Sequence, residues 1–349
     1  MPQFLRMRFL GLAFAISLLI GLAPPSLSDG DHQDIESSQN QNALATEYFN
    51  QAFNCDSKHD YLKAILLYSK AISIRPTYIE AYCNRGLSYE KIGKHNQAIA
   101  DATQAIAINP EYAIAYYNRG VSYGKIGNYS WAIADFSRAI KITPRDFDIY
   151  CSRGNLYAKQ RIYGQAISDY SSAIAINSKC SDAYYNRGIA YDDTGQYVKA
   201  VADYTRAIGI NPNDSYSYAN RSNTYNSLGK HSQAIADATQ AIFLNPANSV
   251  AFHNRGNANE AIGKHSKAIM DYTQAIEINP KDGNSYYGRG ISYTHIGAYL
   301  KAIADYSSGI NVDPRNPDIF DNRGYCYEKV GNHSKAMADY VTAKKLRSR

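Results

Sequence analysis

The feature that most constrains this chain is a pattern of 34 residues that repeats in register from Ala45 to the C-terminus. No insertion breaks the register, and the last unit ends one residue short of full length. A period of about 20–50 residues indicates an array in which each unit packs only against its neighbours. The sequence of 349 residues therefore predicts one elongated array instead of two compact domains. The nine units begin at Ala45, Ile79, Ala113, Phe147, Ser181, Ser215, Ser249, Gly283 and Pro317.

Each unit has the pattern of two helices joined by a turn. In the second unit, Tyr82, Tyr89 and Ile92 are spaced by seven and three residues, which places them on one face of a helix. Gly93 follows at a point where a left-handed residue can end that helix. The second half of the unit carries small and aliphatic residues at helical spacing, and Pro110 cannot continue its hydrogen bonding. The sequence therefore predicts an all-α protein.

The same residue types recur from unit to unit. The second unit shows them as Tyr82, Arg85, Gly86, Tyr89, Ala98, Ala102, Ala105, Ile106 and Pro110. This pattern resembles the tetratricopeptide repeat (TPR) consensus, which has the same period, except that Arg stands where the consensus has Leu. The resemblance implies a right-handed α-solenoid of nine helix–turn–helix units over residues 45–349. It also implies that the first helix of each unit lines a concave groove that holds peptides or partner helices.

The N-terminal residues 1–28 have the features of a secretory signal peptide. Arg6 and Arg8 precede an apolar run of 14 residues, which ends before Pro24. This run is shorter than the roughly 20 residues that a membrane-spanning helix needs. We therefore expect an exported protein, in the periplasm, another extracytoplasmic space or the secretory pathway, with no membrane span after cleavage. The alternative is an uncleaved N-terminus that anchors the chain in a membrane.

Several segments depart from the repeat. Residues 29–44 are polar and almost free of large apolar side chains, which predicts a flexible spacer. The first unit has His59 in place of the turn glycine, and the last has Lys344 where the other eight have Ile. A lysine on a normally buried stripe predicts the solvated end of the array. In the fourth unit, Arg161 replaces the turn glycine and Ser178 replaces the proline, so we expect a locally altered turn there.

Arginine and aspartate recur together in the second to ninth units. The arginines are Arg85, Arg119, Arg153, Arg187, Arg221, Arg255, Arg289 and Arg323. Sixteen residues after each come Asp101, Asp135, Asp169, Asp203, Asp237, Asp271, Asp305 and Asp339. Pairing each Asp with the Arg of the following unit would leave Arg85 and Asp339 alone. We therefore predict that each Arg pairs with the Asp of its own unit and links its two helices.

Charge and motifs argue against several functions. The net charge is +6, no run of Lys and Arg marks a nucleic-acid surface, and nucleic acid is not expected as a partner. No phosphate-binding loop, zinc-protease motif or serine-hydrolase motif occurs, so no catalytic residue and no cofactor is predicted. The five cysteines fall at different repeat positions, apart from Cys83 and Cys151, which are two units apart. We predict neither a disulfide framework nor a metal site.

The predicted working surface is the groove. Six units carry Asn just before the Arg, and three units carry a tyrosine just before that position. These amides and phenols could hydrogen-bond an extended peptide, or the amides could instead bond the neighbouring unit. The candidate partner-binding residues are Asn84, Tyr117, Asn118, Tyr185, Asn186, Asn220, Asn254, Tyr287 and Asn322.

The repeat accounts for nearly every residue after position 45, which leaves little room for catalytic machinery. The sequence therefore predicts a non-enzymatic scaffold for protein–protein interaction that binds a protein or peptide ligand. The alternative is a structural or assembly component, or an accessory subunit of an envelope complex, that self-associates.

Overall fold

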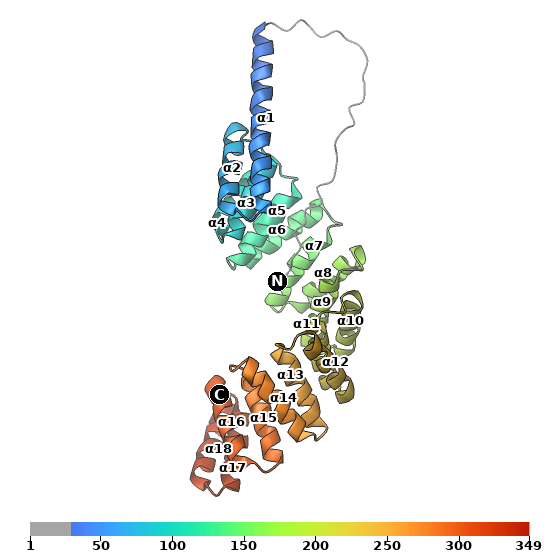
Figure 1. Cartoon of the computed structure of the whole chain (residues 1–349), viewed down its shortest axis with the longest axis vertical. Coiled ribbons are helices and arrows are strands. Elements are labelled where there is room, and N and C mark those ends of the chain that lie inside the picture. Colours follow the sequence, from blue (N-terminus) through green and yellow to red (C-terminus); the bar gives the residue numbers. More distant parts are fainter. Residues whose placement is uncertain (1–28, 349) are drawn as a thin grey trace.

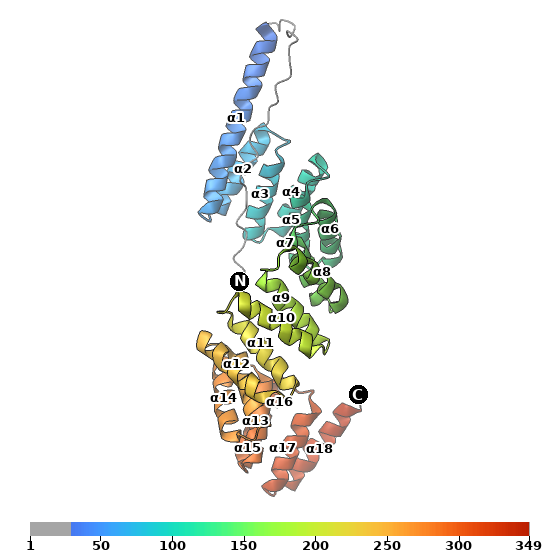
Figure 2. The ribbon, with the colours of Figure 1, turned by 90° about the vertical axis from the view of Figure 1, so that its right-hand side faces the viewer.

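The computed structural model describes residues 29–348, which form eighteen helices and no strand. The helices follow one another as antiparallel pairs along an elongated, winding array (Figures 1 and 2). Their bounds are α1 Asp29–Ser57, α2 Tyr61–Ile74, α3 Ile79–Lys91, α4 His95–Ile108, α5 Ala113–Lys125, α6 Tyr129–Ile142, α7 Phe147–Lys159, α8 Tyr163–Ile176, α9 Ser181–Asp193, α10 Tyr197–Ile210, α11 Ser215–Ser227, α12 His231–Leu244, α13 Ser249–Ala261, α14 His265–Ile278, α15 Gly283–His295, α16 Tyr299–Val312, α17 Pro317–Lys329 and α18 His333–Arg347. The all-helical array of nine units is thus confirmed.

The odd-numbered helices lie on the inner side of the curved array. Each odd-numbered helix touches the odd-numbered helix of the next unit, whereas no two even-numbered helices touch within residues 29–348. Helices on the inside of a curve are closer together than those on the outside, so the contacts define the side. We refer to the surface formed by the odd-numbered helices as the inner face.

Close approach of the two helices within a unit depends on a glycine opposite an aromatic ring. In the fifth unit, a Cβ placed on Gly188 of α9 would lie 2.8 Å from Cε1 of Tyr204 of α10. Tyr204 is 1% exposed, so its ring has no room to move away. The aromatic residues of the repeat are therefore core residues, as their helical spacing predicts.

The turns between the two helices of each unit share one backbone conformation. Seven units have a glycine there with φ between 70° and 84°. His59 and Arg161 occupy the same place in the first and fourth units with φ of 63° and 61°. The expectation of an altered turn in the fourth unit is therefore wrong. The turn keeps its left-handed geometry, and Arg161 adopts a conformation that is costly for a residue with a Cβ.

The segment 29–44 differs from its prediction as a flexible spacer. The structure contains it in α1, which runs without a break from Asp29 to Ser57. Its polar composition excludes a core of its own, but extending an existing helix adds one hydrogen bond per residue and needs no new nucleus. After Gly30 the segment holds neither glycine nor proline, so nothing interrupts that extension. The extended part of α1 projects beyond the first unit (Figure 1).

The C-terminal end of the array is solvated, as the sequence predicts. Lys344 of α18 is exposed, whereas Ile72, Ile208 and Ile276 at the same repeat position are buried. The predicted signal peptide lies outside the described residues. Among the helices of residues 29–348, none is long and apolar enough to cross a membrane.

Candidate binding groove

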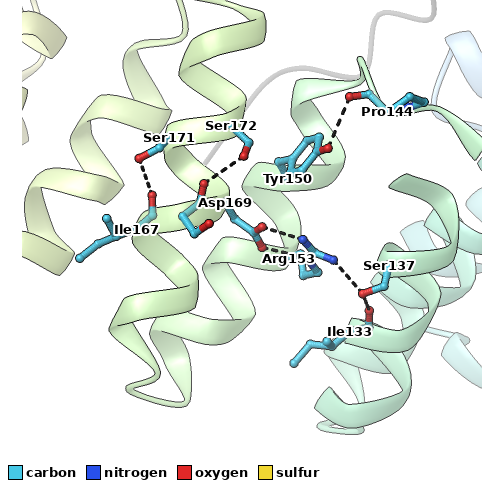
Figure 3. Close-up of polar contacts among 10 residues, drawn as sticks. Ile133, Ser137, Pro144, Tyr150, Arg153, Ile167, Asp169, Ser171 and Ser172 are labelled. Atoms are coloured by element: carbon cyan, nitrogen blue, oxygen red, sulfur yellow. Dashed lines mark hydrogen bonds and ion pairs between the residues drawn. The ribbon is translucent and has the colours of Figure 1, made fainter. Parts of the chain in front are cut away.

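The inner face is held in place by the predicted pairs of arginine and aspartate. All eight pairs form within their own units, which confirms the predicted pairing. In the fourth unit, Arg153 Nε donates to Asp169 Oδ2 at 2.8 Å and Nη2 donates to Oδ1 at 2.7 Å (Figure 3). This two-pronged geometry fixes both side chains, and Asp169 is only 4% exposed. Each pair therefore ties the first helix of its unit to the second.

Each arginine also reaches the unit before it, a contact that the sequence analysis missed. Arg153 Nη1 donates to Ser137 Oγ of α6 at 2.8 Å, and Ser137 in turn donates to the carbonyl of Ile133 (Figure 3). The accepting hydroxyls lie sixteen residues before each arginine. They are Ser69, Thr103, Ser137, Ser171, Thr205, Thr239, Thr273 and Ser307.

The sequence contains the signal for this second contact. Eight units carry Ser or Thr at that position, and the ninth unit, which no arginine follows, carries Val341. Val341 is 59% exposed on α18. The hydroxyl is thus present in every unit that has a following arginine. The network joins consecutive units as well as the two helices of each unit, so it holds the inner face in one shape.

Four of the six predicted groove asparagines use their amide N–H groups to bond the preceding unit. Asn220 and Asn322 donate to the phenol oxygens of Tyr185 and Tyr287, at 3.0 and 2.9 Å. Asn254 donates to the carbonyl of Ala219 at 2.9 Å. Asn186 donates to Asn155 Oδ1 at 3.2 Å. The alternative in which the asparagines bond the neighbouring unit therefore describes these four residues, and two of the three predicted tyrosines accept from them.

The other predicted residues lie toward the N-terminal end of the inner face. The Oη of Tyr117 lies 3.4 Å from Ser152 Oγ in the next unit. Burial raises the pKa of Tyr117, so this phenol is protonated. Asn118 is buried, and its Nδ2 has no hydrogen-bond partner. Asn84 is also buried and lines a pocket between the first three units.

This pocket is the most apolar opening on the inner face. It has a volume of about 330 Å³ and forms between α1, α3 and the start of α5. Residues from all three helices contribute, so it exists only when the units are stacked. We refer to it as the N-terminal pocket. Its lining residues are Phe49, Asn50, Phe53, Glu80, Cys83, Asn84, Tyr112 and Ile114.

The walls of the N-terminal pocket are rigid and mostly uncharged. Phe49 stacks on Tyr78, with ring centroids 5.0 Å apart, and this contact fixes one wall. Burial raises the pKa of Cys83 to about 12 and that of Tyr112 to about 12, so both are protonated at neutral pH. A protonated thiol in apolar surroundings behaves as a small hydrophobic residue. The pocket is therefore suited to an apolar side chain, with Glu80 as its one carboxylate.

The remaining polar groups of the structure do not form a metal centre. Within residues 29–348, no three His, Cys, Asp or Glu side chains are placed to hold a metal ion together. The inner face thus offers shape, apolar surface and hydrogen-bonding groups.

Comparison with protein families identifies the repeats directly. A model of the tetratricopeptide repeat matches residues 79–112, 113–146, 181–214 and 249–282. Three further models of the same repeat match residues 57–93, residues 271–304, and residues 215–248 and 317–349. The matches cover well over half of the chain, and six of them coincide with units read from the sequence.

Solved structures show the same fold at low sequence identity. A tetratricopeptide repeat protein from Parabacteroides merdae is 20% identical, with a TM-score of 0.53 over 72% of this chain and 99% of that chain. The APC/C hetero-tetramer Cut9–Hcn1 has a TM-score of 0.56 at 17% identity, over 85% of this chain and 59% of that chain. YrrB, described as a TPR protein with an unusual peptide-binding site, is 21% identical over 51% of this chain and 92% of its own, with a TM-score of 0.43. A search of curated proteins gave no match.

Proposed function

Because this chain belongs to the tetratricopeptide repeat proteins, we propose that it is a non-enzymatic scaffold that binds a peptide along its inner face. Proteins of this family commonly mediate protein–protein interactions, and they do so without chemistry of their own. The single observation that carries the proposal is the N-terminal pocket, which opens on the inner face and is lined by apolar residues from three consecutive units. A bound peptide places one apolar side chain in this pocket.

The form of the ligand follows from the surroundings of the pocket. A volume of about 330 Å³ lies at the lower end of the range for small-molecule sites and accommodates one large side chain. Asn50 and Asn84 supply amides beside the apolar walls, where they can hydrogen-bond the peptide backbone. Glu80 disfavours an acidic side chain at this place, because like charges repel in a partly desolvated site. The proposed ligand is thus a peptide with an aromatic or aliphatic anchor and no neighbouring carboxylate.

A charge in the pocket tests this assignment. The probe is a fluorescent synthetic peptide obtained by selecting a random peptide display library against the wild-type chain. Phe53→Glu is expected to weaken binding of this peptide by at least about tenfold, because the apolar anchor would meet a buried charge. Phe53 is 48% exposed, so the substitution leaves the fold intact. Fluorescence anisotropy measures the affinity, and circular dichroism confirms that the variant is helical.

The matched control is Leu66→Glu on α2, outside the inner face. Leu66 is 57% exposed and does not line the pocket, so this variant is expected to bind the peptide as the wild type does. Equal loss of binding in both variants would contradict the proposal, and so would a selection that yields no binder. A selected peptide that binds Phe53→Glu with unchanged affinity would place the binding site elsewhere.

We further propose that the protein is exported, on the basis of the sequence of residues 1–28. Mass spectrometry of the protein isolated from its native host is expected to find a mature N-terminus at Asp29. An intact Met1 in the membrane fraction would instead support the anchored alternative. An intact Met1 in the cytosolic fraction would contradict export.

A further inference from the structure

Two positions of each unit meet on the inner face although 29 residues separate them. In the seventh unit, Nδ1 of His253 on α13 lies 3.8 Å from Oδ2 of Asp282, which precedes α15. In the second unit, Cys83 of α3 and Tyr112, which precedes α5, belong to the same packed cluster. The stacking of units thus brings the middle of one odd-numbered helix against the start of the next. Any two residues at these positions are neighbours.

In the fourth unit both positions are cysteines. Cys151 lies in α7, and Cys180 is the residue that caps the N-terminus of α9. Their thiols are hydrogen-bonded to each other. Both are free in the structure, and both are only partly buried, so a reagent can reach them. The other cysteines, Cys55, Cys83 and Cys326, have no cysteine neighbour of this kind among the described residues.

We propose that Cys151 and Cys180 are a redox-active pair that closes to a disulfide between the fourth and fifth units. This inference is independent of the proposed function, since it rests on the two thiols and not on the N-terminal pocket. The sequence analysis compared cysteines at equal repeat positions and paired none of them. The structure shows that the relevant neighbours occupy two different positions of the same unit.

The surroundings assign a different role to each sulfur. The hydrogen bond from the Cys151 thiol lowers the pKa of Cys180 to about 7, and the backbone N–H of Ala183 acts in the same direction. The same hydrogen bond raises the pKa of Cys151, and burial adds to this effect. Cys180 is therefore the thiolate at neutral pH and the attacking nucleophile. Cys151 is the resolving thiol.

The oxidant in this proposal is a low-molecular-weight disulfide such as glutathione disulfide. The Cys180 thiolate attacks one sulfur of the oxidant, forms a mixed disulfide and releases the first thiolate. Cys151 then loses its proton to solvent and attacks the Cys180 sulfur, which releases the second thiolate. The protein loses two protons and two electrons, and the oxidant becomes two thiols.

The bond would fasten the unit whose turns depart most from the repeat. The closed loop contains α8, the Arg161 turn and Ser178, which stands in place of the usual proline. A cross-link over a loop of this length restricts the unfolded chain and therefore stabilises the folded one. We expect oxidation to raise the midpoint of thermal unfolding of the fourth and fifth units by about 5 °C, and reduction to reverse the change.

The test uses the wild-type chain incubated with glutathione disulfide and then alkylated and digested without reduction. Mass spectrometry is expected to find a peptide in which Cys151 and Cys180 are linked, and to lose it after reduction. The remaining cysteines are expected to be alkylated. Oxidised protein in which these two thiols stay free, or in which another pair is linked, would overturn the proposal.

Two variants test the assigned roles. Cys151→Ser lacks the resolving thiol and is expected to accumulate a glutathione adduct on Cys180. Cys180→Ser lacks the nucleophile and is expected to react at Cys151 at least about tenfold more slowly. Glutathione on Cys180 of the wild type with no progress to the linked peptide would overturn the pair as a disulfide. Faster modification of Cys151 than of Cys180 would overturn the order of attack.

Discussion

Asp203→Ala is expected to lower the free energy of unfolding by about 3 kcal/mol, one of the two largest effects that we predict. Asp203 is 5% exposed and accepts from Nε and Nη2 of Arg187 at 2.7 and 2.8 Å. Without the carboxylate, the Arg187 guanidinium would lack its counter-charge in a half-buried site and would keep only its bond to Ser171. Chemical denaturation followed by circular dichroism measures the loss.

Lys199→Ala is the matched control for Asp203→Ala. Lys199 lies on the same helix, α10, but its side chain is exposed. Its ammonium contacts only Gln196 Oε1 at 2.8 Å and the ring of Tyr191. An exposed contact of this kind contributes about 0.5 kcal/mol. Equal destabilisation by the two substitutions would show that the pairs of arginine and aspartate do not hold the units together.

The destabilisation by Asp203→Ala is also expected to be local. In a repeat array each unit contacts only its neighbours, so stability is approximately the sum of unit and interface contributions. Hydrogen exchange should therefore speed up most in α9 and α10 and in the adjacent α8, which carries Ser171. Uniform acceleration from α1 to α18 would contradict this view of the array.

Gly290→Ala is expected to destabilise the eighth unit by about 2 kcal/mol. A Cβ on Gly290 of α15 would lie 2.6 Å from Cε1 of Tyr306 on α16. Tyr306 is 1% exposed, and its hydroxyl lies 3.1 Å from Thr294 Oγ1, so the ring is fixed on several sides. The added methyl group therefore forces the two helices apart or pushes the ring from its preferred rotamer.

The same substitution elsewhere should have the opposite sign. Gly209 lies in α10, where a Cβ would meet no atom within 4 Å. Gly209→Ala is expected to stabilise the chain by about 0.5–1 kcal/mol, because alanine loses less backbone entropy in a helix. Thermal unfolding of the two variants measures both effects. A neutral or stabilising Gly290→Ala would show that the spacing of α15 and α16 is not set by the glycine.

Most of the fold could be predicted because the sequence repeats its own evidence. A single unit shows helical spacing and a turn glycine, and nine units in register exclude chance. The pairing of Arg85 with Asp101, instead of a pairing between units, followed from the requirement that no charge be left alone at either end. The serine and threonine acceptors were equally periodic, and Val341 in the last unit could have revealed their role.

The rest depends on distances that the repeat pattern does not contain. The N-terminal pocket needs Phe53 of α1, Cys83 of α3 and Ile114 of α5, and their separation is set by the curvature of the array. Cys151 and Cys180 are neighbours for the same reason. The segment 29–44 was misjudged because its polarity excludes a core but does not exclude the extension of a helix that begins elsewhere.

The most direct test of the scaffold proposal is to locate a bound peptide on the chain. A selected peptide that carries a photoreactive amino acid at its apolar anchor is cross-linked to the wild-type protein, and the modified residues are identified by mass spectrometry. We predict cross-links to α1, α3 and the start of α5, around Phe49, Phe53 and Ile114. Cross-links confined to the even-numbered helices would contradict the account.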